Sequence, residues 1–183
     1  TVPTWPREYG GAALSRAEYT VLIEELKRID ARSPLTGRGV NYIGPTILEL
    51  GTEDQKTRWL PGIARGEGGW AMGYSEPGAG SDLASLNTRA VKEGDHYRIN
   101  GSKMWITNGD IADVAIIWAQ TAEGIRGFIV PTKTQGFSAN QIKHKLSLRA
   151  SITSELVFSN MRLPDSARLP SATSLRAPLT CLA

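Results

Sequence analysis

The sequence predicts an α+β protein in which helices occupy the N-terminal third of the chain and short strands occupy the rest. Apolar residues recur at helical spacing before residue 69, whereas short β-rich runs separated by turn residues begin at residue 70. The chain has 183 residues, of which 40% are hydrophobic, so it can bury a core of its own. We expect the strands to form a compact, antiparallel, barrel-like sheet.

The first predicted helix covers residues 15–29. Ser15 and Glu18 have the spacing of a capping box, in which the hydroxyl and the carboxylate satisfy free N–H groups at the start of a helix. Five apolar residues then recur at helical intervals and are expected to face the core: Tyr19, Leu22, Ile23, Leu26 and Ile29.

A second helix is predicted to end at Leu50, because the following Gly51 is typical of a helix C-terminus. Thr52 and Gln55 then repeat the capping-box spacing and predict a short third helix. Several glycines and a proline interrupt residues 37–45, so an irregular segment is expected there.

Seven short strands are predicted in the second part of the chain. Turn residues at 93–95, 100–101 and 108–109 separate some of them at intervals that suit an antiparallel sheet. The predicted strands cover residues 70–74, 88–91, 96–99, 104–107, 114–120, 126–130 and 155–158. No element is predicted after Pro164.

Composition excludes several classes of protein. The net charge is only +3 and the basic residues are scattered among acidic ones, so nucleic-acid binding is disfavoured. Cys181 is the single cysteine and His96 and His144 are the two histidines, so we expect no disulfide framework and no metal site. No run of about 18 apolar residues and no export signal is visible, so no membrane span is expected.

The segment Tyr74-Ser-Glu-Pro-Gly-Ala-Gly-Ser-Asp82 is the most informative stretch of the chain. A proline and glycines between two strand-like runs let backbone N–H groups approach an anionic or carbonyl-rich ligand, and Ser75 and Ser81 add hydroxyls. On these residues alone the segment fits an ordinary turn equally well.

Together with Trp105-Ile-Thr-Asn108, this segment resembles the flavin-facing loops of the acyl-CoA dehydrogenase family, which carry T-E-P-x-x-G-S-D and W-I-T-N. Ser75 stands where the family has Thr, so a hydroxyl is retained. Further matches follow in the same order along nearly the whole chain. Segments after residue 100 are most similar to glutaryl-CoA dehydrogenase, whereas residues 73–85 are more similar to bacterial fatty-acyl-CoA dehydrogenases.

The resemblance implies three parts: a partial N-terminal helical domain at residues 1–69, a middle β-domain at 70–165, and a linker at 166–183. The family adds a C-terminal four-helix bundle, which is absent from this sequence. The catalytic glutamate of the family lies in that bundle, beyond Ala183. No residue of this chain is therefore expected to act as the catalytic base, and Glu76 is expected to be structural.

The resemblance also implies a set of binding residues. Those expected to bind FAD are Met72, Gly73, Tyr74, Ser75, Gly80, Ser81, Trp105, Ile106 and Thr107. Those expected to bind the acyl-CoA substrate are Ser81, Arg32, Arg149 and Ser151, with Arg38 as an alternative to Arg32. Without the resemblance, Trp105 would be read as a packing aromatic and Thr107 as a residue chosen for its strand propensity.

The function implied is FAD-dependent α,β-dehydrogenation of an acyl-CoA thioester. Electrons would then pass to an electron-transfer flavoprotein, and the intact enzyme would be a homo-oligomer in the bacterial cytoplasm or the mitochondrial matrix. Two alternatives stay open: a non-catalytic fragment that binds flavin or acyl-CoA, and a part of a related acyl-CoA oxidase.

Overall fold

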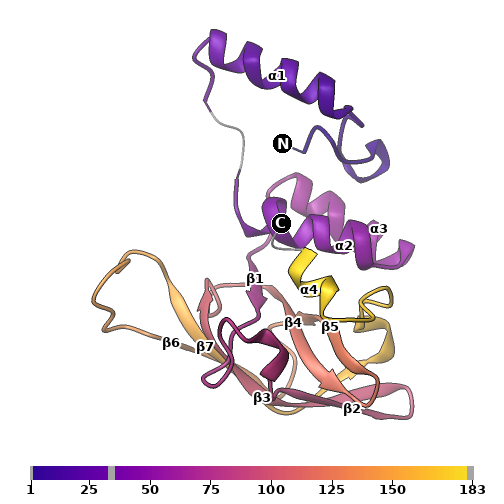
Figure 1. The fold of residues 1–183 in the computed structure, drawn as a ribbon, viewed down its shortest axis with the longest axis vertical. Helices are drawn as coiled ribbons and strands as arrows, with labels where there is room; N and C mark the ends of the chain where they lie inside the picture. Colours follow the sequence, from indigo (N-terminus) through magenta and orange to yellow (C-terminus); the bar gives the residue numbers. More distant parts are fainter. Residues whose placement is uncertain (1, 33–35, 181–183) are drawn as a thin grey trace. The chain divides into compact units, whose positions relative to one another are not determined.

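The computed structural model describes residues 2–32 and 36–180, and its internal contacts divide the chain into two compact units. The first unit is Thr1–Glu67 and the second is Gly68–Ala183. Figure 1 labels the α-helices and the strands of both units.

The first unit is helical. Its elements are the 3-10 helix η1 (Arg7–Tyr9), the helix α1 (Arg16–Arg28), the π-helix η2 (Gly39–Ile43), and the helices α2 (Gly44–Leu50) and α3 (Glu53–Ala64). Both predicted capping boxes are confirmed, since Ser15 and Thr52 each accept from the backbone N–H three residues later and receive the reciprocal side-chain bond. The predicted end of the second helix at Leu50 is also confirmed.

Two predictions for this unit are wrong. The apolar stripe of α1 is not core, because no residue of the helix is buried and Tyr19 and Ile29 are exposed. The buried side chains come from η1, η2, α2, α3 and the segment before η1. That segment contains Trp5, which leaves no room for a side chain at Gly44. Residues 37–45 are not irregular throughout, because η2 continues directly into α2. The i→i+5 bonding of a π-turn has no simple sequence signal.

The second unit is built on one sheet. Its strands are β1 (Trp70–Gly73), β2 (Arg89–Glu93), β3 (His96–Thr107), β4 (Val114–Thr121), β5 (Gly124–Pro131), β6 (Phe137–Gln141) and β7 (Thr153–Pro164). The short helices are η3 (Leu83–Ser85), η4 (Asp165–Ala167) and α4 (Arg176–Thr180).

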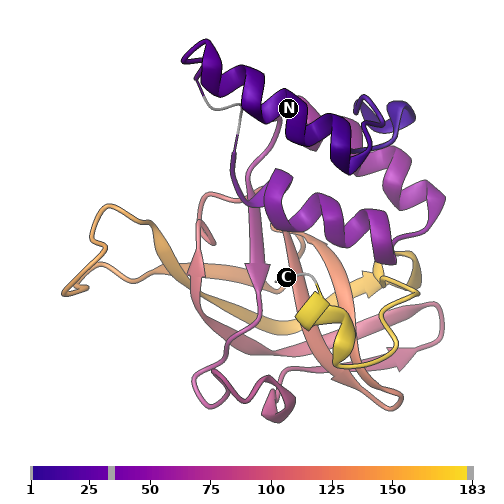
Figure 2. The ribbon, with the colours of Figure 1, turned by 45° about the horizontal axis from the view of Figure 1, so that its top comes forward.

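The strands are ordered β1-β4-β2-β3-β7-β6, and β5 pairs with β4 outside that order. The β2–β3, β3–β7, β6–β7 and β4–β5 pairs are antiparallel, as predicted, whereas β1 runs parallel to β4. The sheet curls into a half-barrel, which Figure 2 shows from the side. The α+β fold class is therefore confirmed, with a mixed rather than purely antiparallel sheet.

One turn was predicted wrongly from the sequence, and several elements were not predicted. Asn100 and Gly101 do not form a turn but lie inside β3, where the register with β7 shifts and Gly101 has φ 142°. Strand β6 was not predicted, because three of its five residues are polar and it lies at the edge of the sheet. The helices η3, η4 and α4 were not predicted either.

The core of the second unit lies between the curled strands and includes Ile99, Ile117, Phe128, Leu156 and Met161. Residues 166–180 follow β7 and pack on the same unit. Leu169 donates its N–H to the Gly127 carbonyl at 2.9 Å, and Arg126 Nη1 donates to the Thr173 carbonyl at 3.0 Å.

Candidate functional site

The loop after β1 and the end of β3 are joined directly. The Met104 N–H donates to the Ser75 carbonyl at 2.8 Å, so the two segments singled out in the sequence lie side by side. Ser75 is half-buried, and neither its N–H nor its hydroxyl donates to another group within the described part of the chain. The pairing therefore leaves polar donors at the edge of the sheet.

Next to this edge, β3 contains a bulge that turns Trp105 outward. The register with β7 shifts between Lys103 and Ile106, and Trp105 has φ 64°, a left-handed conformation that is uncommon for a residue with a large side chain. Trp105 is 61% exposed, although Lys103, two residues before it, and Ile106, directly after it, are buried. Trp105 is thus not a packing aromatic.

Trp105, Thr107 and Ser151 line a common hollow of about 570 Å³, whose other wall is the loop between β6 and β7. Lys145 holds this loop: its Nζ donates to the Leu148 carbonyl at 2.9 Å, to the Thr153 Oγ1 at 2.7 Å and to the Ser151 carbonyl. The Thr107 hydroxyl makes no hydrogen bond among the described residues.

An ion pair is buried behind the Tyr74 and Ser75 segment. Lys103 Nζ lies 2.8 Å from Glu76 Oε1 and 3.1 Å from the Tyr74 carbonyl, and its side chain has no exposed surface. The Glu76 carboxylate also accepts the Asn87 N–H at 2.5 Å and the Thr88 N–H at 3.0 Å.

Burial opposes the ionisation of Glu76, but the hydrogen bonds from Lys103, Thr88 and Asn87 outweigh it and lower the pKa of this carboxyl. Burial lowers the pKa of the Lys103 ammonium, and the Glu76 carboxylate opposes that shift. Glu76 was predicted to be structural, whereas no role was predicted for Lys103. The pairing of Lys103 with Glu76 depends on how β3 meets the loop, which the sequence does not show.

The other expected site residues lie in different surroundings. Met72 and Gly73 are buried within β1, and Ile106 is buried in β3, so none of the three offers an exposed side chain. Gly80 and Ser81 are exposed on the loop that follows Glu76.

The expected substrate residues are not all brought together. Arg149 is exposed and is not part of the wall of the Trp105 hollow, which Ser151 helps to form. Arg32 and Arg38 belong to the first unit, where Arg32 is exposed and Arg38 is half-buried. Cys181 lies outside the described residues.

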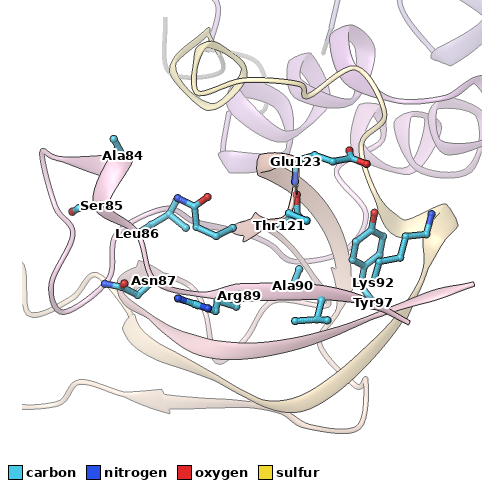
Figure 3. Close-up of a pocket in the computed structure, with 13 residues that line it drawn as sticks. Ala84, Ser85, Leu86, Asn87, Arg89, Ala90, Lys92, Tyr97, Thr121 and Glu123 are labelled. Atoms are coloured by element: carbon cyan, nitrogen blue, oxygen red, sulfur yellow. Dashed lines mark hydrogen bonds between the residues drawn. The ribbon is translucent and has the colours of Figure 1, made fainter. Parts of the chain in front are cut away.

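A second hollow, of about 710 Å³, was not anticipated from the sequence (Figure 3). Residues 84–87 form one side, β2 forms the floor, and the turn between β4 and β5 forms the other side. Arg89 and Lys92 bring positive charge to it and Glu123 brings a negative charge, and Lys92 Nζ lies 3.3 Å from Asp165 Oδ2. The lining residues come from residues 84–92, from Tyr97 of β3 and from residues 120–123, so only the folded sheet gathers them.

Within residues 2–32 and 36–180 no group of three or more His, Cys, Asp or Glu side chains could hold a metal ion. Over the same residues, no helix combines the length and the apolar character needed to cross a bilayer.

Comparison with known proteins gives these features a context. The chain is 42% identical over 164 residues to a short-chain-specific acyl-CoA dehydrogenase of Clostridium acetobutylicum, which covers 86% of this chain and 43% of that protein. It is 39% identical over 169 residues to the mitochondrial isovaleryl-CoA dehydrogenase of Pongo abelii, covering 88% and 40%. This chain therefore spans less than half the length of these relatives.

The fold is matched as well. A glutaryl-CoA dehydrogenase of Mycobacterium smegmatis, solved in complex with FADH2, is 46% identical and superposes with a TM-score of 0.81 over 99% of this chain and 47% of its own. Residues 1–67 match the model of the acyl-CoA dehydrogenase N-terminal domain and residues 71–161 match that of the acyl-CoA dehydrogenase middle domain. These two matches account for most of the sequence, and the chain belongs to the acyl-CoA dehydrogenase family.

Proposed function

We propose that this chain supplies the flavin- and acyl-CoA-binding surface of an enzyme that removes hydrogen from the α and β carbons of an acyl-CoA thioester. One observation carries the proposal above others: the bond from the Met104 N–H to the Ser75 carbonyl sets two motif segments side by side, next to the outward-turned Trp105. Polar donors around an exposed aromatic ring suit a flat, carbonyl-rich heteroaromatic ligand.

FAD is the cofactor that suits these residues. The Ser75 N–H, the Ser75 hydroxyl and the Thr107 hydroxyl have no protein acceptor among the described residues and would donate to the isoalloxazine ring, against which Trp105 would pack. When bound, the flavin supplies the acceptor for the hydride that leaves the β carbon. Fixed donors at the ring favour the negative charge that it gains on reduction.

We assign the coenzyme A part of the substrate to the hollow of Figure 3. Its residues 84–87 follow Ser81 closely in the chain, and Ser81 is the residue that we expect near the thioester end. Arg89 and Lys92 supply positive charge for the phosphates. A volume of about 710 Å³ lies in the range of ligand pockets.

Glu76 is not the base of this reaction. Its carboxylate is buried and accepts hydrogen bonds from Lys103, from the Asn87 N–H and from the Thr88 N–H, and Glu76 lines neither of the two hollows. A carboxylate stabilised in this way binds a proton weakly, and its lowered pKa makes it a poor acceptor of an α-proton.

In this proposal the electrons pass to an electron-transfer flavoprotein, and the intact enzyme is a homo-oligomer of the bacterial cytoplasm or the mitochondrial matrix. The units at Thr1–Glu67 and Gly68–Ala183 would correspond to a helical domain and a β-domain. An acyl-CoA oxidase would use the same surface and differ in its electron acceptor.

The test is flavin binding followed by reduction with substrate. The protein that carries this chain is titrated with FAD, and butyryl-CoA or glutaryl-CoA is then added without oxygen. Bleaching of the flavin absorbance is the expected result. Rapid reoxidation in air would identify an oxidase, bound flavin that neither substrate bleaches would identify a binding fragment, and failure to bind FAD would refute the proposal.

Variants make this test specific to the site. Ser75→Ala and Thr107→Val should each weaken FAD binding about two- to tenfold, the range expected for the loss of one hydrogen bond. Ser138→Ala is the matched control, because Ser138 is an exposed serine of β6 outside both hollows. Equal losses in all three variants would remove the assignment of Ser75 and Thr107.

A further inference from the structure

The buried pair of Lys103 and Glu76 is not explained by stability. Removing two charges from water costs several kcal/mol for each ion, and a buried pair of this kind is often replaced by apolar residues without loss of stability. Here the Lys103 side chain has no exposed surface and that of Glu76 is 5% exposed. A feature this costly to bury points to a role in geometry or in electrostatics.

The contacts of Lys103 show where such a role would act. Its Nζ donates to the Tyr74 carbonyl at 3.1 Å as well as to Glu76. The Tyr74 carbonyl and the Ser75 N–H belong to the same peptide group, and this peptide is trans, so the N–H points away from the carbonyl and hence away from Lys103. Ser75 thus presents its N–H on the side opposite to the buried ammonium.

A cation at a carbonyl oxygen strengthens the donor at the other end of the same peptide. Hydrogen bonds in a chain polarise one another by about 10–30% per bond, and the effect is larger where water is excluded. The Ser75 N–H is the group affected, and it has no acceptor within the described residues. The ammonium therefore acts through one peptide group on a donor at the edge of the candidate site.

The same pair also fixes the segment in place. Glu76 accepts the N–H groups of Asn87 and Thr88, which lead into β2, while Lys103 lies on β3 directly before the bulge at Trp105. Gly73 makes room for the lysine, since a Cβ there would lie 3.2 Å from Lys103 Cγ. Three segments that flank the site are thus held by one charge pair.

We propose that Lys103 and Glu76 are a positioning pair: Lys103 polarises the peptide between Tyr74 and Ser75, so that the Ser75 N–H is a stronger donor to the flavin. Glu76 holds the ammonium in place and keeps the pair neutral overall. This inference rests on the proposed function for the identity of the ligand, but its effect on the Ser75 N–H does not.

The test separates this role from a merely structural one. Lys103→Met leaves the Glu76 carboxylate buried without its cation and should destabilise the second unit strongly. The double variant Lys103→Met with Glu76→Gln removes both charges and should recover the denaturation midpoint. If the pair polarises the peptide, the double variant should regain the wild-type stability. Its Ser75 N–H should nevertheless remain a weaker hydrogen-bond donor than in the wild type.

Two measurements on the double variant read out the donor. Without flavin, the amide proton of Ser75 in the ¹⁵N-labelled chain should resonate upfield of its wild-type position, as a weaker donor does. With flavin, FAD should bind about two- to tenfold more weakly, and its reduction potential should fall. The control is Arg98→Met with Glu93→Gln, which removes a partly exposed ion pair of 2.6 Å in the same sheet and should leave both measurements unchanged.

A Ser75 amide resonance that stays within the spread of the control, in a double variant with restored stability, would overturn the inference. The inference would also be overturned if the FAD affinity and the flavin reduction potential of the double variant returned to their wild-type values together with its stability. A wild-type protein that binds no FAD would refute the proposed function instead, and the amide resonance would still decide whether Lys103 polarises the peptide.

Discussion

Replacing Gly101 by alanine is a sharp test of how β3 is built. Gly101 lies at a register shift between β3 and β7 and has φ 142°, where residues with a side chain are strained. A Cβ at this position would lie 2.7 Å from the Cα of Thr88, the residue directly before β2. Because that atom is backbone, the overlap cannot be relieved by a change of rotamer.

The expected cost has two parts. A residue with a Cβ in a sparsely populated backbone region costs about 1–3 kcal/mol, and overpacking of a close contact costs about 1–3 kcal/mol more. Gly101→Ala should therefore lower the free energy of unfolding of the second unit by about 2–6 kcal/mol. That is a large share of the stability of a domain, which is typically about 5–15 kcal/mol.

Substitutions at two other glycines separate the cost of backbone strain from the cost of the close contact. Gly94 has φ 64° but nothing within 4 Å of its added Cβ, so Gly94→Ala should show the backbone cost alone, about 1–2 kcal/mol. Gly78 has neither a positive φ nor a neighbour within 4 Å, so Gly78→Ala should change stability by less than about 1 kcal/mol.

The assay is urea denaturation of the 183-residue chain and its three variants. Hydrogen exchange of peptides from β3 and β7 identifies the transition of the second unit. The expected order, from most to least destabilised, is Gly101→Ala, then Gly94→Ala, then Gly78→Ala. A Gly101→Ala variant as stable as Gly94→Ala would show that the contact with Thr88 is not close, and would refute the bulge geometry.

Three further outcomes are expected. Thr52→Ala removes the capping bond to α3 and should cost about 1 kcal/mol, whereas Thr57→Ala on the exposed face of the same helix should cost nothing. The hydrogen bond from Tyr9 to Glu53 raises the pKa of Tyr9 to about 12 from 10.0, so its stabilising contribution is fully present below pH 10 and lost as the pH rises toward 12. Spectrophotometric titration checks this, and Glu53→Gln should bring the Tyr9 pKa back toward 10. In the enzyme that carries this chain, Arg32→Ala should weaken glutaryl-CoA use by about 1.5–3 kcal/mol and spare butyryl-CoA, and equal losses on both would return Arg32 to the solvated surface.

Features that depend on a few neighbouring residues could be predicted from the sequence alone. The capping boxes at Ser15 and Thr52 need only a hydroxyl and a second side chain three residues later, and both are present as predicted. The change from helices to strands near residue 70 was also visible, because helical and strand periodicity differ within any short window. The two motif segments identified the family from residue types and order.

The contacts between distant segments could not be predicted from the sequence. The exposure of α1 could not be predicted from its apolar stripe, since a stripe identifies one face of a helix but not what packs against that face. Gly101 looked like a turn because Asn-Gly favours one, but pairing with β7 held it inside a strand. The ion pair of Lys103 and Glu76 and the hollow of Figure 3 join residues far apart in the chain. Such contacts depend on how the sheet curls and on which strands become neighbours, and these are properties of the whole fold rather than of any local pattern.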